Sequence, residues 1–249
     1  MDVMNQLFFG IYPYIALSVL VIGSVIRFDR EPYTWRTGSS QLLRRRQLVA
    51  GSILFHLGVL MIFGGHFVGL LTPVVVWDTL GVSHSAKQLL AMAAGGLAGV
   101  MMLIGGLLLL HRRLFDPRIR RTSSFGDTAI LIVLLIQLCL GLSTIFVSAG
   151  HMDGAEMMKF MAWAQGIFTF QPGVANHVAD VHWLFKAHIV LGLTIFLVFP
   201  FTRLVHMLSA PVWYLNRRGW QLVRSRRQMP VRRVSSLPAH LRGRSRGGQ

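Results

Sequence analysis

Four histidines of this chain lie within two long apolar stretches, where an ionisable side chain is costly and usually has a function. The stretches are residues 49–71 and 183–208, each long enough to cross a bilayer as a helix. The first holds His56 and His66, and the second holds His188 and His206. A neutral imidazole nitrogen is a common ligand of haem iron. Two helices with two histidines each therefore match the ligand set of two bis-histidine haems.

The composition is that of an integral membrane protein. Of the 249 residues, 53% are hydrophobic and only 14% are charged, against about 25% charged in an ordinary soluble domain. The sequence predicts an all-α fold, an integral membrane bundle of five transmembrane helices. Their expected ranges are 7–26, 49–71, 88–110, 125–148 and 183–208.

The single cysteine, Cys139, excludes an internal disulfide and a cluster held by several cysteines. It lies in the middle of an apolar run, so we expect a small buried side chain there. The first residues, MDVMNQ, contain no lysine or arginine, and a cleavable signal peptide is therefore not expected.

The net charge of +16 follows membrane topology rather than a nucleic-acid surface. Arginines are frequent in two connections and at the C-terminus, with six in residues 27–47, five in 111–124 and ten in 211–249. The other two connections hold one basic residue each, Lys87 and Lys159. Because basic residues accumulate on the cytoplasmic side, we expect the N-terminus outside and the C-terminus in the cytoplasm.

This topology decides which histidines can meet. The second helix starts on the cytoplasmic side and the fifth starts outside, so His66 pairs with His188 near the outer face and His56 pairs with His206 near the cytoplasm. At ~1.5 Å per residue, His56 and His66 are ~15 Å apart along one helix, whereas His188 and His206 are ~27 Å apart along the other. A kink at Pro200 or inclined haems would account for the difference.

Residues 153–170 predict a helix in the long fourth connection, with apolar side chains at spacings of three and four. We expect it on the outer membrane surface, either as a cap on the bundle or as an ordinary packing helix. Gly95 and Gly99 form a small-xxx-small pair that allows two helices to approach closely. The glycines of the second helix serve the same purpose or make room for a flat macrocycle.

The chain is expected to divide into a membrane domain, residues 1–227, and a basic tail, residues 228–249. The tail has no apolar periodicity, so we expect it to be disordered on the cytoplasmic side. It serves topology alone, or it contacts anionic lipid or a cytoplasmic partner.

Several longer motifs then suggest a family. They are FFGIYPYIA, YTWRTGSSQLL, SILFHLGVLMIFGGHFVGLLTP, LLLLHRRLFDPRIR, HMDGAEMMKFMAWAQ and HIVLGLTIFLVFPFTRLVH. Together they extend over residues 7–227, and in them the chain resembles the gamma subunit of respiratory membrane-bound nitrate reductase, a dihaem cytochrome b.

The resemblance implies five transmembrane helices and two b-type haems in the cytoplasmic (inner) membrane. His66 and His188 would ligate the outer haem iron, and His56 and His206 the inner one. It also implies that quinol is oxidised near the outer haem, at a site that includes Lys87, the backbone around Gly65, and His66. From the residues alone, Lys87 is equally an interfacial lysine whose charge reaches the membrane surface.

The resemblance further implies cytoplasmic partners, an iron–sulfur beta subunit and a molybdenum alpha subunit that reduces nitrate. This chain has no cysteine cluster and no pterin motif, so we expect it to pass electrons without reducing nitrate itself. Its other partners would be membrane quinol and the lipid bilayer. Arg112, Arg113 or Arg203 would pair with haem propionates, since guanidinium binds carboxylates in a bidentate manner, or would mark topology only.

Two alternatives remain from the sequence. One is a related dihaem cytochrome b that serves a sulfite- or heterodisulfide-reductase-type complex; HMDGAEMMKFMAWAQ favours the nitrate reductase family instead. The other is a cofactor-free transporter that relays protons through intramembrane histidines. A transporter of this kind often contains internal repeats or broken helices, and no repeat is evident here.

Overall fold

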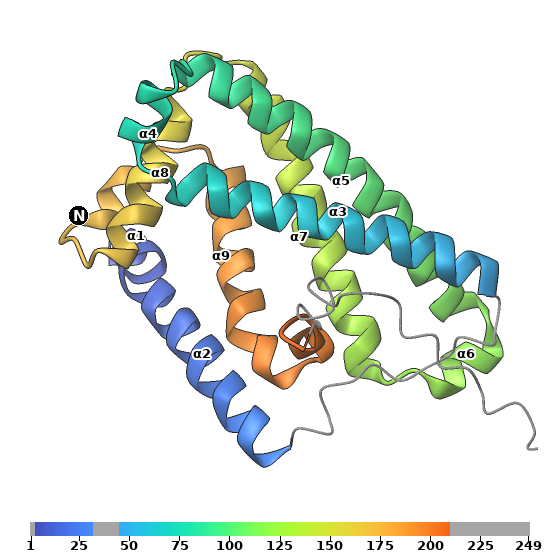
Figure 1. Ribbon diagram of the computed structural model, residues 1–249. Coiled ribbons are helices and arrows are strands. Elements are labelled where there is room, and N and C mark those ends of the chain that lie inside the picture. Colours follow the sequence, from blue (N-terminus) through green and yellow to red (C-terminus); the bar gives the residue numbers. More distant parts are fainter. Residues whose placement is uncertain (1–2, 32–44, 210–249) are drawn as a thin grey trace, which may run out of the picture. The chain divides into compact units, whose positions relative to one another are not determined.

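A computed structural model describes residues 3–31 and 45–209 of the chain (Figure 1). Within these ranges the secondary structure is helical and contains no strand. The predicted tail, residues 228–249, and the motif YTWRTGSSQLL lie outside the described residues.

The described residues include five helices long and apolar enough to cross a membrane, which confirms the predicted fold class. The first span comprises α1 (Val3–Gln6), η1 (Leu7–Ile11) and α2 (Tyr12–Arg30). The next three are α3 (Arg45–Leu71), α5 (His84–Phe115) and α7 (Phe125–Ala149), and the last is α9 (Trp183–Val198) together with the turn η4 (Phe199–Phe201). Shorter helices lie between them, namely α4 (Val74–Thr79), α6 (Pro117–Thr122), α8 (Ala155–Phe168) and η3 (Val174–Val178).

Polar caps extend the helices beyond the apolar runs. The Ser83 hydroxyl accepts a hydrogen bond from Ala86 N at the start of α5, and the Ser124 hydroxyl accepts one from Asp127 N at the start of α7. Such caps satisfy backbone donors that a helix start leaves without a partner. Hydropathy therefore located the helices, while the capping residues set where α5 and α7 begin.

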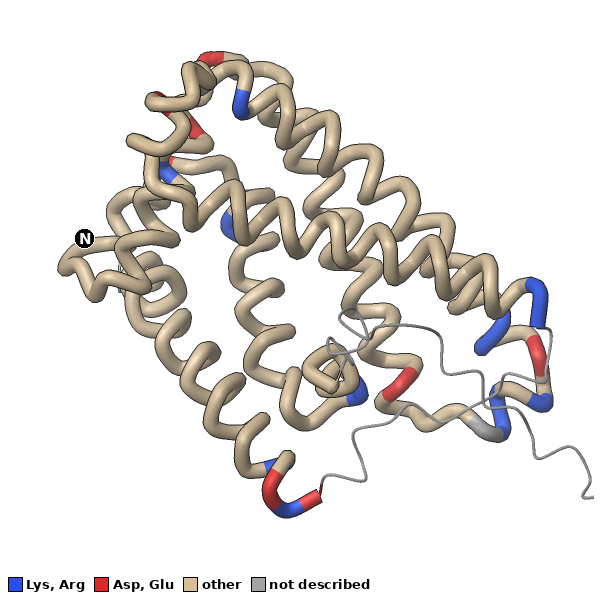
Figure 2. The backbone as a smooth tube through the Cα atoms, in the orientation of Figure 1, with Lys and Arg blue, Asp and Glu red and all other residues tan. Residues whose placement is uncertain are grey.

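Charged side chains lie toward the two ends of the bundle, and the stretches between them carry almost none (Figure 2). One end includes α4 and α8, and we call it the α8 end. The other includes Arg27, Arg112 and Arg203, and we call it the arginine end. This distribution fits a bilayer around the uncharged middle, while the assignment of the two ends to the two sides of the membrane stays a prediction.

The closest helix contact joins α3 to α5 through glycines. A Cβ atom on Gly58 would lie 2.7 Å from Ala98 O, and one on Gly105 would lie 2.7 Å from Gly51 O. Of the expected pair on α5, only Gly99 meets a neighbour, the Leu142 side chain, whereas a Cβ on Gly95 would touch no described atom within 4 Å. The contact is therefore made by Gly105 of α5 and by Gly51 and Gly58 of α3.

The predicted amphipathic helix is α8, and it covers one end of the bundle, which is one of the two arrangements considered from the sequence. The Trp163 indole donates to Phe9 O at 2.9 Å, and the Gln165 amide donates to Leu70 O at 3.0 Å. Met161 and Ile167 of the predicted apolar stripe are buried, but Phe168 is exposed. The α8 side chains thus satisfy carbonyls at the end of α3 and bind it to the first span.

Two expectations are corrected. The fifth helix does not continue to Leu208: α9 ends at Val198, and η4 (Phe199–Phe201) and η5 (Arg203–Met207) follow around Pro200. Cys139 is exposed rather than buried, because it occupies a position of α7 that no described helix covers.

The glycine contact predicts that Gly105→Val destabilises the bundle. The added side chain would be forced against the α3 backbone, a type of overpacking that costs about 1–3 kcal/mol. Gly95→Val is the matched control, since it places the same β-branched residue on α5 in open space. Thermal unfolding of the purified protein should show a clear loss for Gly105→Val only; equal melting temperatures for both variants would contradict the contact.

Candidate functional site

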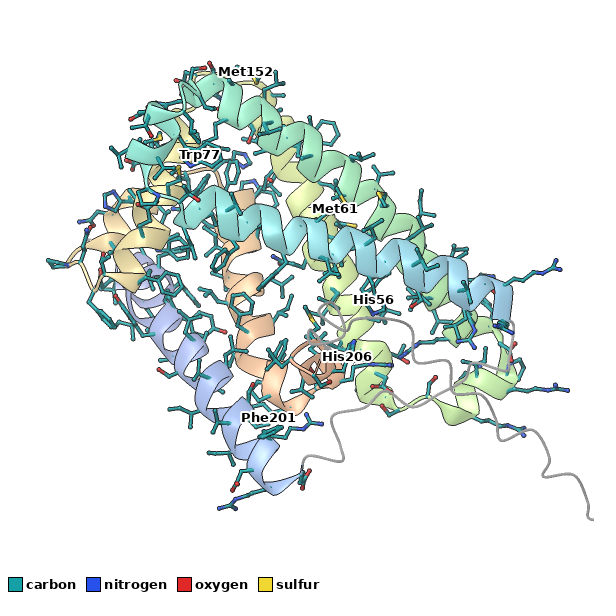
Figure 3. All side chains as sticks on the ribbon, in the orientation of Figure 1. His56, Met61, Trp77, Met152, Phe201 and His206 are labelled. Atoms are coloured by element: carbon teal, nitrogen blue, oxygen red, sulfur yellow. The ribbon has the colours of Figure 1, made fainter. Side chains whose placement is uncertain are left out.

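The four histidines of the apolar stretches form two pairs between α3 and the segment from α9 to η5. The ring centroids of His66 and His188 are 6.0 Å apart, and those of His56 and His206 are 6.1 Å apart. Figure 3 labels His56 and His206 and shows them on facing elements. The structure thus brings together the two pairs that topology selected.

Three of the four imidazoles are oriented by backbone carbonyls. His56 Nδ1 lies 2.8 Å from Ser52 O, His66 Nδ1 lies 2.8 Å from Ile62 O, and His206 Nδ1 contacts Arg203 O. A carbonyl can only accept, so Nδ1 carries the proton in each case. Nε2 is then left as the free ligand nitrogen, which is the arrangement in which metal-binding histidines usually occur.

His188 is held by α7 instead. The Gln137 amide nitrogen lies 3.1 Å from His188 Nδ1 and donates to His188 O at 3.0 Å. One turn further on α7, a Cβ atom on Gly141 would lie 2.9 Å from His188 Cε1. Gln137 and Gly141 therefore form a seat for this ring, with one polar contact and one position that tolerates no side chain.

The two elements that carry the histidines stand apart from each other. In the described part of the chain, α3 packs on α5 and α8, while α9 packs on α2 and α7. His56 and His66 remain exposed although they face histidines of the other element. A Cβ on Gly64 or Gly65 would meet no described atom within 4 Å. α3 is therefore open next to His66, at Gly64 and Gly65.

These observations fit two bis-histidine haems. Two imidazole nitrogens bound to one metal ion at about 2 Å, each roughly 1 Å from its own ring centre, place the centroids ~6 Å apart. Both pairs have this separation. His206 lies beyond the end of the fifth span, and burial lowers the pKa of this imidazole below its ordinary value, which favours the neutral form that ligation requires.

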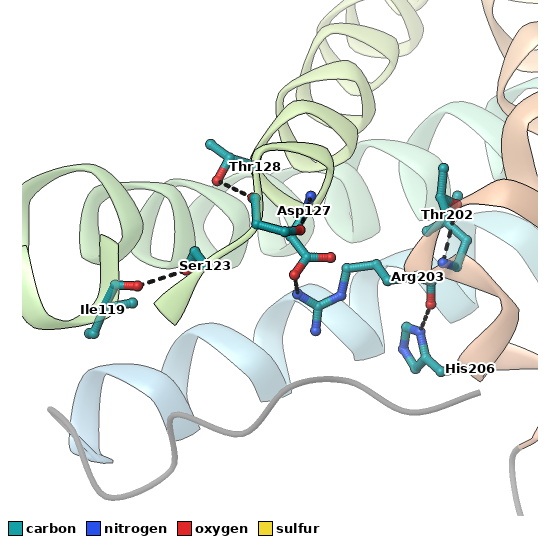
Figure 4. Close-up of polar contacts among 9 residues, drawn as sticks. Ile119, Ser123, Asp127, Thr128, Thr202, Arg203 and His206 are labelled. Carbon is teal, nitrogen blue, oxygen red and sulfur yellow. Dashed lines mark hydrogen bonds and ion pairs between the residues drawn. The ribbon is translucent and has the colours of Figure 1, made fainter. Parts of the chain in front are cut away.

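Basic side chains gather beside the His56–His206 pair at the arginine end. Arg203 Nη1 lies 3.6 Å from Asp127 Oδ2, and Figure 4 shows this ion pair next to His206. Arg113 lies close enough to Arg203, Asp127 and Arg112 to be affected by their charges, and within the described residues its buried Nη1 has no hydrogen-bond partner. Asp127 thus lies near two guanidinium groups, those of Arg203 and Arg113, and the buried Arg113 Nη1 is available for an anionic ligand.

The predicted quinol residues lie toward the α8 end. Lys87 is only 4% exposed, so it is not the surface lysine that its position in the sequence allowed. Its ammonium group contacts the Met161 sulfur and lies 4.6 Å from the centre of the Trp77 ring. Gly65 directly precedes His66, which belongs to the His66–His188 pair, the pair nearer the α8 end.

Sequence reasoning missed Gln137, Gly141 and Asp127. Gln137 gave a signal, since it is a lone amide in the apolar run LLIQLCLG of the fourth span. Asp127 is likewise the one carboxylate of its helix. Only the packing of α7 against α9 identifies what these side chains contact.

Five spans, with two pairs of histidines on facing elements, define the chain as a membrane protein of the cytochrome b class. The model of the nitrate reductase gamma subunit family matches residues 5–226. The chain therefore belongs to the family of nitrate reductase gamma subunits, the cytochrome b subunits of an oxidoreductase in the inner membrane.

Individual relatives agree with this assignment. The respiratory nitrate reductase 1 gamma chain of Escherichia coli is 52% identical over 91% of this chain and 100% of its own length. The respiratory nitrate reductase 2 gamma chain of the same organism is 52% identical over 90% of this chain and 98% of its own. The nitrate reductase gamma chain of Bacillus subtilis is 39% identical over 86% of this chain and 95% of its own.

The seat on α7 predicts that Gly141→Leu displaces His188. The new side chain would occupy the position of the ring, so the protein should lose the haem of the His66–His188 pair and retain the other. Gly126→Leu is the control on the same helix, since a Cβ there meets nothing within 4 Å among the described residues. Haem quantified per polypeptide should fall in Gly141→Leu relative to the wild type and to Gly126→Leu; unchanged haem content in Gly141→Leu would refute the seat.

Proposed function

We propose that this chain is a dihaem cytochrome b that oxidises membrane quinol and delivers the electrons to cytoplasmic subunits that reduce nitrate. The proposal rests on the two histidine pairs, whose ring centroids are 6.0 and 6.1 Å apart. The relatives are gamma chains of nitrate reductases, which supports the identity of the electron acceptor.

His66 with His188 and His56 with His206 would each hold one b-type haem. Bound haems supply one-electron carriers at two depths of the bilayer. The protein residues fix the imidazole rotamers, through Ser52 O, Ile62 O and Arg203 O on three ligands and through Gln137 on the fourth. At ~1.5 Å per residue the two ligands on α3 lie ~15 Å apart along the helix.

The arginine end suits the propionates of the haem held by His56 and His206. Arg113 is the better candidate, because its buried Nη1 has no partner among the described residues. Arg203 already faces Asp127, so it would neutralise less additional charge. Guanidinium groups bind carboxylates in a planar, bidentate manner.

Quinol would be oxidised beside the His66–His188 pair. Lys87 is a buried cation that contacts no carboxylate among the described residues, and its ammonium group can donate to a quinol or quinone oxygen. Gly65 adds no side chain next to that ligand pair, which leaves room for a flat ring. Two protons would leave the quinol at this end of the bundle.

The orientation proposed is the N-terminus outside and the C-terminus in the cytoplasm, which follows from the charge pattern of the connections. The α8 end is then the outer end, and the arginine end faces the cytoplasm. An iron–sulfur beta subunit would receive electrons there and pass them to a molybdenum alpha subunit. Proton release outside and proton consumption by nitrate reduction inside would build a transmembrane potential.

Substitution of single histidines tests the pairing. His66→Ala and His188→Ala should each remove the same haem, and His56→Ala and His206→Ala should each remove the other, because each haem would be held by both histidines of its pair. His111→Ala, an exposed histidine at the end of α5, is the control and should retain both haems. A dithionite-reduced minus oxidised spectrum with haem quantified per chain checks this; a wild-type protein without haem would favour a cofactor-free transporter.

Substitution of Lys87 tests the quinol site separately. Lys87→Ala should lower kcat/KM for quinol about 10- to 100-fold, the range expected for the loss of a hydrogen bond from a charged donor. Both haems should remain. Lys159→Ala is the matched control, since Lys159 is a partly exposed lysine of α8 that is paired with Glu156.

The measurement compares quinol-dependent nitrate reduction by the intact complex with reduction driven by a reduced viologen. The viologen bypasses the quinol site, so its rate should not change in Lys87→Ala. An equal fall in both rates would assign Lys87 to assembly rather than to quinol.

A further inference from the structure

The helical segment that carries His188 and His206 is interrupted between them. α9 ends at Val198, Pro200 lies in the short turn η4, and Thr202 is extended with φ −113° and ψ 177°. A proline interrupts a helix because it cannot donate a backbone hydrogen bond and its ring crowds the preceding turn. Carbonyls around the break therefore lose the helical donors that an unbroken helix would supply.

Arg27, near the end of α2, supplies donors to this break. Its Nη1 donates to Pro200 O at 2.6 Å and to Thr202 O at 2.8 Å. One turn earlier on α2, a Cβ atom on Gly23 would lie 2.9 Å from the Pro200 ring. α2 thus contacts the break at two positions, one a charge-assisted contact and one a close approach of glycine to proline.

The break leads directly to a haem-ligand candidate. Thr202 caps the turn η5, since its hydroxyl accepts from Leu204 N at 3.2 Å, and His206 lies in that turn. The His206 ring is then oriented by Arg203 O. Only three residues separate the carbonyl that Arg27 binds from His206, so movement of Thr202 would move the imidazole.

We propose that Arg27 is a positioning residue for His206: by holding the carbonyls of Pro200 and Thr202, it sets the place of this imidazole opposite His56. The inference rests on the proposed haem function. Arg27 does not contact the ring; it acts through the backbone of the break. The distribution of basic residues along the sequence explains Arg27 by membrane topology alone. Arg30, three residues later, is exposed and serves that topological purpose equally well.

The test compares Arg27→Ala, Arg27→Lys and the control Arg30→Ala in the membrane-bound complex with all subunits. Haem content, redox titration and the low-spin electron paramagnetic resonance signals are recorded for each haem. In Arg27→Ala the haem held by His56 and His206 should be retained about tenfold less well or more, as for other residues that orient metal ligands. Its signal should shift, while the haem held by His66 and His188 is unchanged.

Arg27→Lys should restore part of the lost haem, because an ammonium group can donate to one of the carbonyls but lacks the planar fork of arginine. Arg30→Ala should behave as the wild type. Unchanged signals of both haems in Arg27→Ala would overturn the proposal. Parallel loss of both haems in both Arg27 variants would overturn it too, because Arg27 would then act in general folding. A wild-type complex with fewer than two haems would instead reject the proposed function itself.

Discussion

A histidine that binds a metal usually donates its other ring N–H to a fixed acceptor, which sets the orientation of the ring. In this chain helical carbonyls do so for His56 and His66, since the carbonyl four residues earlier lies within reach of Nδ1. Each histidine of α3 therefore carries its own orienting group. The segment that carries the other two histidines lacks this regularity. The Gln137 amide nitrogen, a donor, lies against His188, and His206 depends on the turn that Pro200 creates.

The glycines of α3 differ along the helix, with close contacts at Gly51 and Gly58 and open space further on. Gly51 and Gly58 bring it against α5 so closely that no side chain fits between the backbones. Gly64 and Gly65 adjoin open space within the described structure. In a bilayer, where lipid is as apolar as the side chains, such close backbone contact is a main source of helix association. The α3–α5 contact thus fixes the part of α3 that carries His56.

The break at Pro200 also resolves the unequal histidine spacing. On one straight helix, His188 and His206 would lie ~27 Å apart, almost twice the ~15 Å between their partners. Because α9 ends at Val198 and the chain turns, His206 leaves the axis of α9 and reaches His56. Asp127 of α7 and Arg27 of α2 contact the residues of this turn from two other helices. The pair of His56 and His206 thus depends on a break in the helix that neighbouring helices hold in place, and not on a longer α9.

The sequence by itself determined the five spans, the helix near residues 155–168 and the two histidine pairs, because hydropathy, apolar spacing and charge alternation are local properties of the chain. It also indicated a kink at Pro200. Only the tertiary structure decided which glycines touch, that Cys139 is exposed, and that Lys87 is buried. The roles of Gln137 and Arg27 were undetermined for the same physical reason: each contacts a group more than fifty residues away, and a side chain's partner across a bundle depends on how the helices pack.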